Sequence, residues 1–277
     1  MANRTRQNNE ITRHRFLDEA GDTAFYGRRR TPIIGIQKGV SLSFGLGMVK
    51  FRTPLEPIRT EIRRLQEQVA KDPYYNDDWR VQKKIKEPGG YYFHATDDPE
   101  SARKVFYEYI KSLDLSFEMV VARKFPSIFA SKHDNKETEF YADLLSHLLK
   151  NKLKTGGDLV LNIAQRGNAT RNANLQKSLD KATTRFLLRN SPEDVKTHVV
   201  FNVQTPRLEP LLCITDYLCW SVQRVFEQGD ARHYNFINEK ISLVIDLYDN
   251  SKYENSQNYY DKRNPLTPLN KISPPSY

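Results

Sequence analysis

Cysteine is scarce in this chain, with two residues among 277. Cys213 and Cys219 are six positions apart in a segment of helical periodicity, so their side chains point in different directions and cannot pair with each other. This excludes a disulfide framework and predicts a reducing, cytoplasmic location. The two cysteines lie in an apolar stretch without a histidine close in sequence, which argues against a cysteine nucleophile.

Long apolar runs and the common catalytic motifs are missing too. No apolar run reaches the ~18–20 residues that cross a bilayer, so we expect no membrane partner. The first 15 residues are polar and lack the apolar centre of a signal peptide. The sequence also contains no GxGxxG or GxxxxGK(S/T) loop, no CxxC pair, no HExxH and no GxSxG. These absences disfavour nucleotide-loop, zinc-protease and nucleophile-elbow chemistry.

Acidic side chains are outnumbered, mainly near the N-terminus. The chain has 43 Lys and Arg against 34 Asp and Glu, and residues 1–60 hold 11 of the basic and 5 of the acidic ones. A basic surface favours polyanions, with nucleic acid first and an anionic membrane second. The other interpretation is that these side chains only keep the chain in solution.

Length and composition predict a single domain with two tails. Residues 1–12 are rich in Asn, Arg and Thr, so we expect them to be disordered. Residues 13–250 are expected to form the domain. Residues 251–277, rich in Tyr, Asn, Ser and Pro, are expected to form a C-terminal tail.

Hydrophobic periodicity predicts the order of the elements. The expected strands are residues 13–19, 40–51, 91–94, 117–123, 158–164 and 197–203, and the expected helices are residues 54–72, 99–113, 137–153, 175–188, 208–228 and 234–248. Residues 74–90 are expected to be irregular. Antiparallel strands therefore come first, and strands that alternate with helices, which implies parallel pairing, follow. This is the order of an RNase H-like α/β fold with a mixed sheet and long C-terminal helices, and other mixed α/β folds share it.

The segment RFLDEAGDTAFYG contains the first acidic candidates. An apolar strand ends in Asp18 and Glu19 and is broken by Gly21. A carboxylate beside apolar residues needs a cation, a metal or several hydrogen-bond donors. Because neighbours on a strand face opposite sides, only one of the two acids can enter a shared site. The competing interpretation is that Asp18 or Asp22 organises the Gly21 turn.

Two further candidates follow later in the chain. Asp216 lies among apolar residues of the helix at 208–228 and needs a partner, either a basic side chain or a metal shared with Asp18. Glu209, on roughly the same helix face, is a weaker candidate. His94 is either a ligand, donor or base of such a site or a hydrogen-bonded structural residue.

Two basic segments have the composition of phosphate contacts. Arg166 and Arg171 lie in AQRGNATR, a Gly- and Asn-containing segment that follows an expected strand, and Arg28, Arg29 and Arg30 form a triplet. Arginine suits phosphate oxygens because its guanidinium donates in a fixed fork. The alternative for both segments is an ordinary loop with solvated charge.

Five separated blocks of the chain resemble, in the same order, a bacterial family of domains of unknown function. Members of that family open with a DESGD or DEAGD strand and are regarded as RNase H-like. The resemblance spans about residues 13–250. The blocks are FLDEAGD at 16–22, FHATDDPESARKVF at 93–106, VVARKF at 120–125, IAQRG at 163–167 and ITDYLCWSVQRVFEQGD at 214–230.

The resemblance implies an acidic site made by Asp18, Glu19 and Asp216 around divalent cations, which activate water for phosphodiester hydrolysis. Such a site normally takes another acid from a middle strand. The stretch LNIAQRG at 161–167 contains only amides there, and these bind a hard cation less strongly than carboxylates do. Either Asp158, Glu118 or Glu209 completes the site, or catalysis is weakened or absent.

The leading prediction is a nuclease that uses Mg²⁺ or Mn²⁺ to cut DNA or RNA. Asp18 and Asp216 are the predicted metal ligands, Glu19 and His94 are the predicted supporting catalytic groups, and the arginines hold the nucleic acid. The alternative is a non-catalytic module that binds nucleic acid, or a protein partner or second copy, within a phage-defence or mobile-element system. Its aromatic tail would then supply protein contacts.

Overall fold

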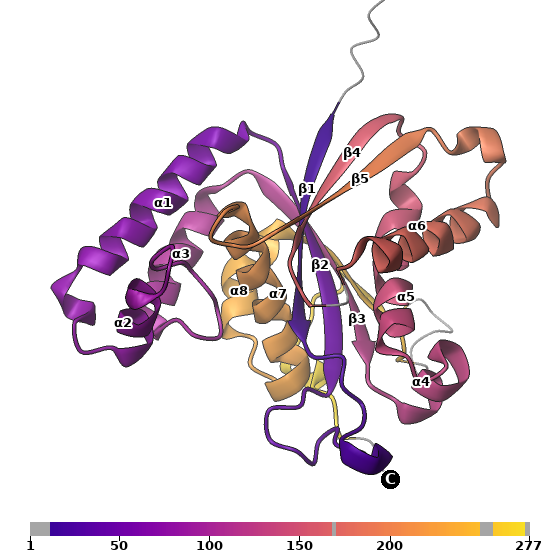
Figure 1. The fold of residues 1–277 in the computed structure, drawn as a ribbon, viewed down its shortest axis with the longest axis horizontal. Helices are drawn as coiled ribbons and strands as arrows, with labels where there is room; N and C mark the ends of the chain where they lie inside the picture. The colour runs from indigo at the N-terminus through magenta and orange to yellow at the C-terminus, as the bar shows by residue number, and fades with distance from the viewer. Residues whose placement is uncertain (1–11, 168–169, 250–256, 275–277) are drawn as a thin grey trace, which may run out of the picture.

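The computed structural model describes residues 12–167, 170–249 and 257–274. Seven strands of this part of the chain form one mixed sheet in the order β5-β4-β1-β2-β3-β6-β7 (Figure 1). The strands are β1 (Arg13–Gly21), β2 (Ser43–Phe51), β3 (Leu115–Arg123), β4 (Gly157–Ala164), β5 (Thr197–Gln204), β6 (Ile241–Asp246) and β7 (Tyr259–Tyr260). The pairs β1–β2, β2–β3 and β6–β7 are antiparallel, and the pairs β1–β4, β4–β5 and β3–β6 are parallel.

Helices cover both faces of the sheet, so the fold has three layers (Figure 1). One face packs against α1 (Leu55–Lys71), α2 (Trp79–Lys86), α3 (Glu100–Ser112), α7 (Leu211–Gln228) and α8 (Arg232–Ile237). The other face packs against α4 (Pro126–His133), α5 (Glu137–Leu149) and α6 (Asn172–Leu187). Each face has its own apolar core, which is why the sheet can bury both of its sides.

Strand β1 has a neighbour on each side and contributes alternately to the two cores. Phe16 is buried in the core beneath α7, and Leu17 is buried in the core beneath α5. Asp18 and Glu19 continue this alternation, because successive side chains of a strand point to opposite faces. The two acids therefore start from different sides of the sheet, as the sequence predicts.

Helix α7 approaches the sheet closely because glycine replaces a side chain on β2. Gly47 is the β2 partner of Asp18 in the antiparallel register. A Cβ atom on Gly47 would lie 2.4 Å from both Cys219 Sγ and the Phe117 ring. Cys219 Sγ in turn lies 3.4 Å from the carbonyl oxygen of Asp18. The missing side chain thus lets α7 rest on the backbone beside Asp18.

Two of the expected local structures are wrong between β2 and β3. Residues 91–94 are not a strand, because their backbone groups bond to side chains: the His94 N–H donates to Asp98, and Lys84 donates to the Tyr92 carbonyl. Residues 79–86 form α2 and are not irregular. The Asp78 carboxylate caps this helix, which buries little apolar surface and so has a weak sequence pattern.

The C-terminal region also differs from the expected long helix at 234–248. Helix α8 ends at Ile237, and ISLVID forms β6, because β-branched residues there pair with the open edge of β3. Helix α4, which opens at Pro126, was not expected.

The described part of the expected C-terminal tail packs on the domain. Ile272 donates its N–H to the Phe226 carbonyl at the end of α7, at 2.7 Å, and Leu266 donates to the Tyr234 hydroxyl. Tyr260, Leu266 and Ile272 are buried in the core on the α7 side. The predicted disorder concerns residues 1–12, of which 1–11 lie outside the described residues.

No helix within the described ranges is long and apolar enough to cross a membrane.

Candidate functional site

A cleft of about 390 Å³ opens at the carboxyl ends of β1 and β4, beside α7. Loops that leave the carboxyl ends of parallel strands diverge there, which is where α/β sheets commonly bind ligands. All four predicted catalytic residues line the cleft, and they come from three separate parts of the fold. These are Asp18 and Glu19 of β1, His94 of the loop before α3, and Asp216 of α7.

Asp18 and Asp216 approach the cleft from the sheet and from the helix packed on it. The Asp18 Oδ1 atom accepts the N–H of Glu19 at 2.8 Å, and the Asp216 Oδ2 atom accepts the N–H of Ala95 at 2.7 Å. No side chain or backbone donor among the described residues bonds to Asp18 Oδ2 or Asp216 Oδ1. Each carboxylate is thus held by one oxygen and keeps the other for a ligand.

The pKa values of both Asp18 and Asp216 are raised, as expected for buried carboxylates whose charge is not balanced by a cation. Burial raises the pKa of Asp18 well above its usual range, and the neighbouring carboxylates of Asp216 and Glu19 raise it further. Burial also raises the pKa of Asp216, although His94 and the Ala95 N–H oppose that shift. A proton or a cation relieves such a pair, because either one offsets burial and repulsion together.

The expectation that only one of Asp18 and Glu19 can enter a shared site is wrong, because both line the cleft at the end of β1. Unlike Asp18, Glu19 already has a basic partner. Arg166 Nη1 lies 2.7 Å from Glu19 Oε1, and the Glu19 side chain is 13% exposed. Burial raises the pKa of Glu19, and Arg166 offsets part of that effect. Arg166 also donates to the Gly21 carbonyl at 3.2 Å and lies over the Phe44 ring. Of the predicted phosphate contacts, this arginine is in the cleft and is committed to Glu19.

His94 lies on a loop that a buried aspartate holds in place. Asp98 accepts the His94 N–H at 2.8 Å, the Lys84 ammonium at 2.9 Å and the Tyr217 hydroxyl at 2.6 Å. The His94 Nδ1 atom lies 3.3 Å from Asp97, and its side chain is 36% exposed. The imidazole can therefore reach substrate in the cleft while its backbone stays fixed.

The other predicted phosphate contacts lie outside the cleft. Arg28, Arg29 and Arg30 form an exposed 3₁₀ turn in the β1–β2 connection. Arg171 is exposed and directly precedes α6. None of these four arginines lines the cleft in the described structure, so any role in nucleic-acid binding would place the strand beyond it.

The three acids proposed to complete the site lie elsewhere. Glu209 forms an ion pair with Arg59 at 2.7 Å. Asp158 lies at the opposite end of β4 and contacts His198 at 3.0 Å. Glu118 pairs with a lysine on the α5 side. The amide Gln165 occupies the cleft where a middle-strand acid was sought, next to Arg166.

Asp22 follows the turn interpretation instead of the catalytic one. Its carboxylate accepts the N–H and hydroxyl of Ser41 at 2.7 and 2.8 Å and the Lys124 ammonium at 3.0 Å. Burial alone would raise the pKa of Asp22, but Lys124 and Ser41 hold it below its usual value. Gly21 has φ +88°, and a Cβ there would lie 2.4 Å from the Ser43 carbonyl, so this turn requires glycine.

Sequence reasoning missed most of the α7 wall of the cleft. Trp220 and Gln223 line it together with Asp216. Their spacing of four and seven residues places all three on one helix face, so the periodicity already contained this signal. Trp220 also lies against two guanidinium groups, those of Arg103 at 4.8 Å and Arg224 at 5.1 Å.

The donor set fits a hard divalent cation held partly by substrate. Across residues 12–167, 170–249 and 257–274, no three His, Cys, Asp or Glu side chains are grouped to hold a metal ion. Mg²⁺ is often bound by one or two carboxylates, with waters and substrate phosphates as its other ligands. Asp18 and Asp216 supply two carboxylates with a free oxygen each, which matches that kind of site and not a closed structural zinc site.

The chain matches no protein-family model, no curated protein and no solved structure.

Proposed function

We propose that the cleft is the active site of a nuclease that hydrolyses phosphodiester bonds in DNA or RNA with Mg²⁺ or Mn²⁺. The observation that carries this proposal is the meeting of Asp18 and Asp216 in one cleft. Both carboxyl groups have raised pKa values there, mainly because of burial. Two buried carboxyl groups that lie close together are costly, so in proteins they usually bind a cation, share a proton or take part in catalysis.

The sheet supports an RNase H-like assignment as part of the proposal. Strand β1 lies between β2, which is antiparallel to it, and β4, which is parallel to it. Among the five strands β3-β2-β1-β4-β5, the first three pair antiparallel and the last three pair parallel, which is compatible with this assignment. Strands β6 and β7 extend the sheet beyond β3. The candidate acids occupy β1, the middle one of these five strands, and α7, which packs against it.

The predicted site residues divide the work of this mechanism among them. Asp18 and Asp216 would hold the cation through the oxygens that accept no hydrogen bond, since their other oxygens are fixed by backbone N–H groups. A bound divalent cation activates a water and stabilises the leaving oxygen of the phosphodiester. His94 donates or accepts a proton at the solvent side of the cleft. Arg166 neutralises Glu19 and presents its partly exposed guanidinium to the substrate.

The test is cleavage of single- and double-stranded DNA and RNA with Mg²⁺ or Mn²⁺. For Asp18→Asn and Asp216→Asn we expect the cleavage rate to fall at least ~100-fold. Even substitution of residues that only hydrogen-bond to a metal ligand lowers metal affinity or activity by ~10–100-fold. Asp158→Asn is the matched control, since Asp158 lies at the other end of β4, and it should cut like the wild type. Equal cleavage by all four proteins would refute the assignment of Asp18 and Asp216.

A second candidate function is nucleic-acid binding without cleavage. The observation in its favour is that Glu209, in an ion pair with Arg59, and Asp158, in contact with His198, are engaged away from the cleft. Binding that weakens steeply with salt, with no metal-dependent cleavage of any substrate, would select this function.

A further inference from the structure

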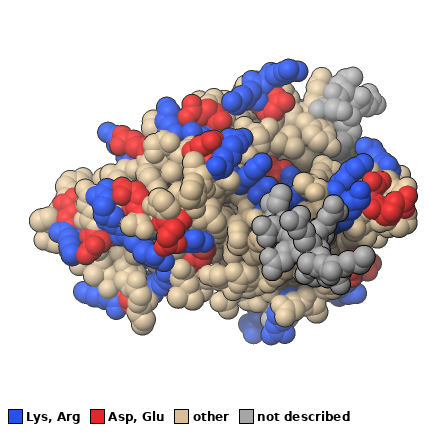
Figure 2. Space-filling view, turned by 90° about the horizontal axis from the view of Figure 1, so that it is seen from above, with Lys and Arg blue, Asp and Glu red and all other residues tan. Residues whose placement is uncertain are grey.

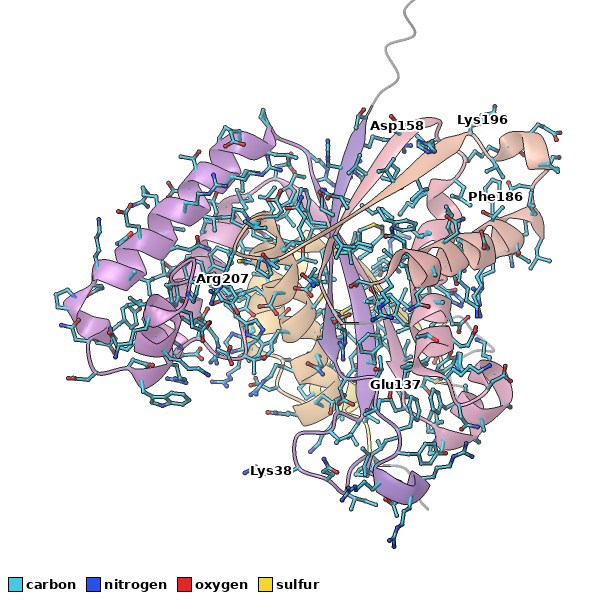
Figure 3. All side chains as sticks on the ribbon, viewed as in Figure 1. Lys38, Glu137, Asp158, Phe186, Lys196 and Arg207 are labelled. Carbon is cyan, nitrogen blue, oxygen red and sulfur yellow. The ribbon has the colours of Figure 1, made fainter. Side chains whose placement is uncertain are left out.

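A second cleft, of about 370 Å³, lies in the layer of α5 and α6, on the other face of the sheet from the carboxylate cleft. It is enclosed by the C-terminal ends of these two helices and by β6 and β7. Figure 3 labels Phe186 of α6 on this side, across the sheet from Arg207. The two clefts share no lining residue among those described, so a ligand of one does not occupy the other.

The nitrogen bases that line this second cleft come from four side chains. They are His147, Lys150, Arg185 and Arg189, and no carboxylate of the described residues lines it. Arg185 contacts the buried carboxylate of Asp143 behind the cleft. Lys150 and Arg189 form no ion pair with any described residue. Two positive charges therefore face the cleft with no acid of residues 12–167, 170–249 or 257–274 paired to them.

The crowding of these cations lowers the pKa values of two of the basic groups. Burial lowers the pKa of Lys150, and the guanidinium groups of Arg185 and Arg189 lower it further. Burial and Arg185 also lower the pKa of His147 to about 3, so this imidazole is neutral at physiological pH. Like charges held close together in a partly buried cleft are unfavourable until an anion joins them.

The remaining walls have a different chemistry. Leu243 and Ile245 of β6 and Tyr259 of β7 line the cleft, and the Tyr259 side chain is 43% exposed. An apolar wall with an aromatic ring suits a nucleobase, because each of the bases has a flat face that stacks on aromatic side chains. Guanidinium groups suit a phosphate, because their donors form a planar fork. The volume lies in the range of small-molecule sites.

We propose that this second cleft binds a nucleoside phosphate, with its phosphate against Lys150, Arg185 and Arg189 and its base against Tyr259. The ligand is either a free mononucleotide or the terminal nucleotide of a nucleic-acid strand, since both present the same groups. Binding here needs neither a metal nor the carboxylate cleft, so it stands or falls separately from nuclease activity.

The test measures binding to the full chain in EDTA at constant ionic strength. The probes are inorganic phosphate, AMP, and one oligonucleotide with either a 5′-phosphate or a 5′-hydroxyl. We expect AMP to raise the melting temperature of the wild type, and K150Q/R189Q to bind AMP at least ~10-fold more weakly, since charge-assisted hydrogen bonds to phosphate are lost. Lys38→Gln, an exposed lysine far from the cleft in Figure 3, is the matched control and should bind like the wild type.

Two further readouts separate this proposal from a structural role. Without ligand, the double variant should melt no lower than the wild type, because it loses two repelling charges. Tyr259→Ala should weaken AMP binding but not phosphate binding, as expected if the ring contacts the base. Preference for the 5′-phosphorylated oligonucleotide would identify a strand end as the source, and binding of AMP alone would identify a free nucleotide. Failure of AMP to bind, or equal binding by wild type and double variant, would overturn the proposal.

Discussion

At the scale of single residues, Asp18 carries an electrostatic cost that an exposed aspartate does not. Burial raises its pKa, and Asp216 and Glu19 add to the effect. A carboxyl group whose pKa is raised by folding stabilises the folded state below its unfolded pKa of ~3.9. That contribution disappears as the pH rises through the folded pKa. Once the pH exceeds the folded pKa, and without a cation, ionised Asp18 therefore destabilises the chain.

Asp18→Asn should consequently be more stable than the wild type at pH 8 in EDTA. The neutral amide avoids the cost, and the gain is ~1.4 kcal/mol for each unit by which folding raises the pKa. Urea unfolding of both proteins between pH 5 and pH 8 measures the difference, which should shrink toward pH 5 as wild-type Asp18 takes up its proton.

Magnesium provides the control for this prediction. Added Mg²⁺ should raise the free energy of unfolding of the wild type and leave that of Asp18→Asn nearly unchanged, because only the wild type keeps both carboxylates. A variant that is less stable than the wild type at pH 8, in EDTA, would contradict the electrostatic account of Asp18.

At the scale of elements, the site depends on how closely α7 packs on β1 and β2. Gly47→Ala places a methyl group 2.4 Å from Cys219 Sγ and from the Phe117 ring, so the helix or the sheet must shift. Overpacking of this kind costs ~1–3 kcal/mol. We expect that loss in urea unfolding, together with weaker cleavage, since the shift moves Asp216 relative to Asp18.

Gly27→Ala is the matched control for the α7 prediction. Gly27 also has an ordinary φ, of −87°, and an added Cβ would lie 3.0 Å from Ile33 Cγ2 and 3.5 Å from Thr31 Oγ1, so a shift of a few tenths of an ångström accommodates it. Its effect on stability should be smaller than that of Gly47→Ala, and cleavage should not change. Equal losses from the two substitutions would mean that α7 packing is not the cause.

Elements with strong periodicity were predictable from sequence, and those defined by distant neighbours were not. Helix α1 buries Ile58, Ile62, Leu65 and Val69 at regular spacing, and its expected range agrees with the observed one. Helix α2 has only eight residues and buries one apolar residue, Val81, beside Lys84, so few apolar positions mark it in the sequence. Strand β6 contains β-branched residues, but the partner that makes it a strand is the open edge of β3, which residues 241–246 do not reveal by themselves.

The candidate site shows the same division. Acids at the end of β1 and inside an apolar helix stand out in the sequence because aspartate is unusual in both places. Their surroundings do not: the N–H that holds Asp216 comes from Ala95, 121 positions earlier. The pairing of Glu19 with Arg166 likewise joins residues that only the β1–β4 register brings together.

At the scale of the whole molecule, the net charge of +9 is spread over a mixed surface. In Figure 2, Lys and Arg are interspersed with Asp and Glu over the face shown, without one broad positive patch. Some of these charges pair with a neighbour one turn away on the same helix, such as Arg64 with Glu61 and Lys71 with Glu67 of α1. Electrostatic attraction of nucleic acid would therefore depend on local groups and less on the net charge.

The exposed triplet Arg28, Arg29 and Arg30 tests this dependence. If all three contact phosphates, their replacement by alanine should weaken binding to every sequence and reduce the slope of log K against log salt by up to ~2.7, or ~0.9 for each contact. The slope is measured as binding of nucleic acid at several salt concentrations to the Asp18→Asn protein, with and without the triple substitution. Lys104→Gln, on the outer face of α3, is the control. An unchanged slope would remove the triplet from the nucleic-acid surface.

The packing of the last described residues sets a practical limit on how this protein can be shortened. Ile272 bonds to the final turn of α7, and Tyr260, Leu266 and Ile272 fill the core beside it. Cutting the chain after residue 250 would strip apolar surface from the same helix that carries Asp216, and it would leave β6 as a bare sheet edge. A loss of cleavage in such a fragment would then report on the scaffold of the cleft, and assays of the site need a chain that extends at least to Ile272.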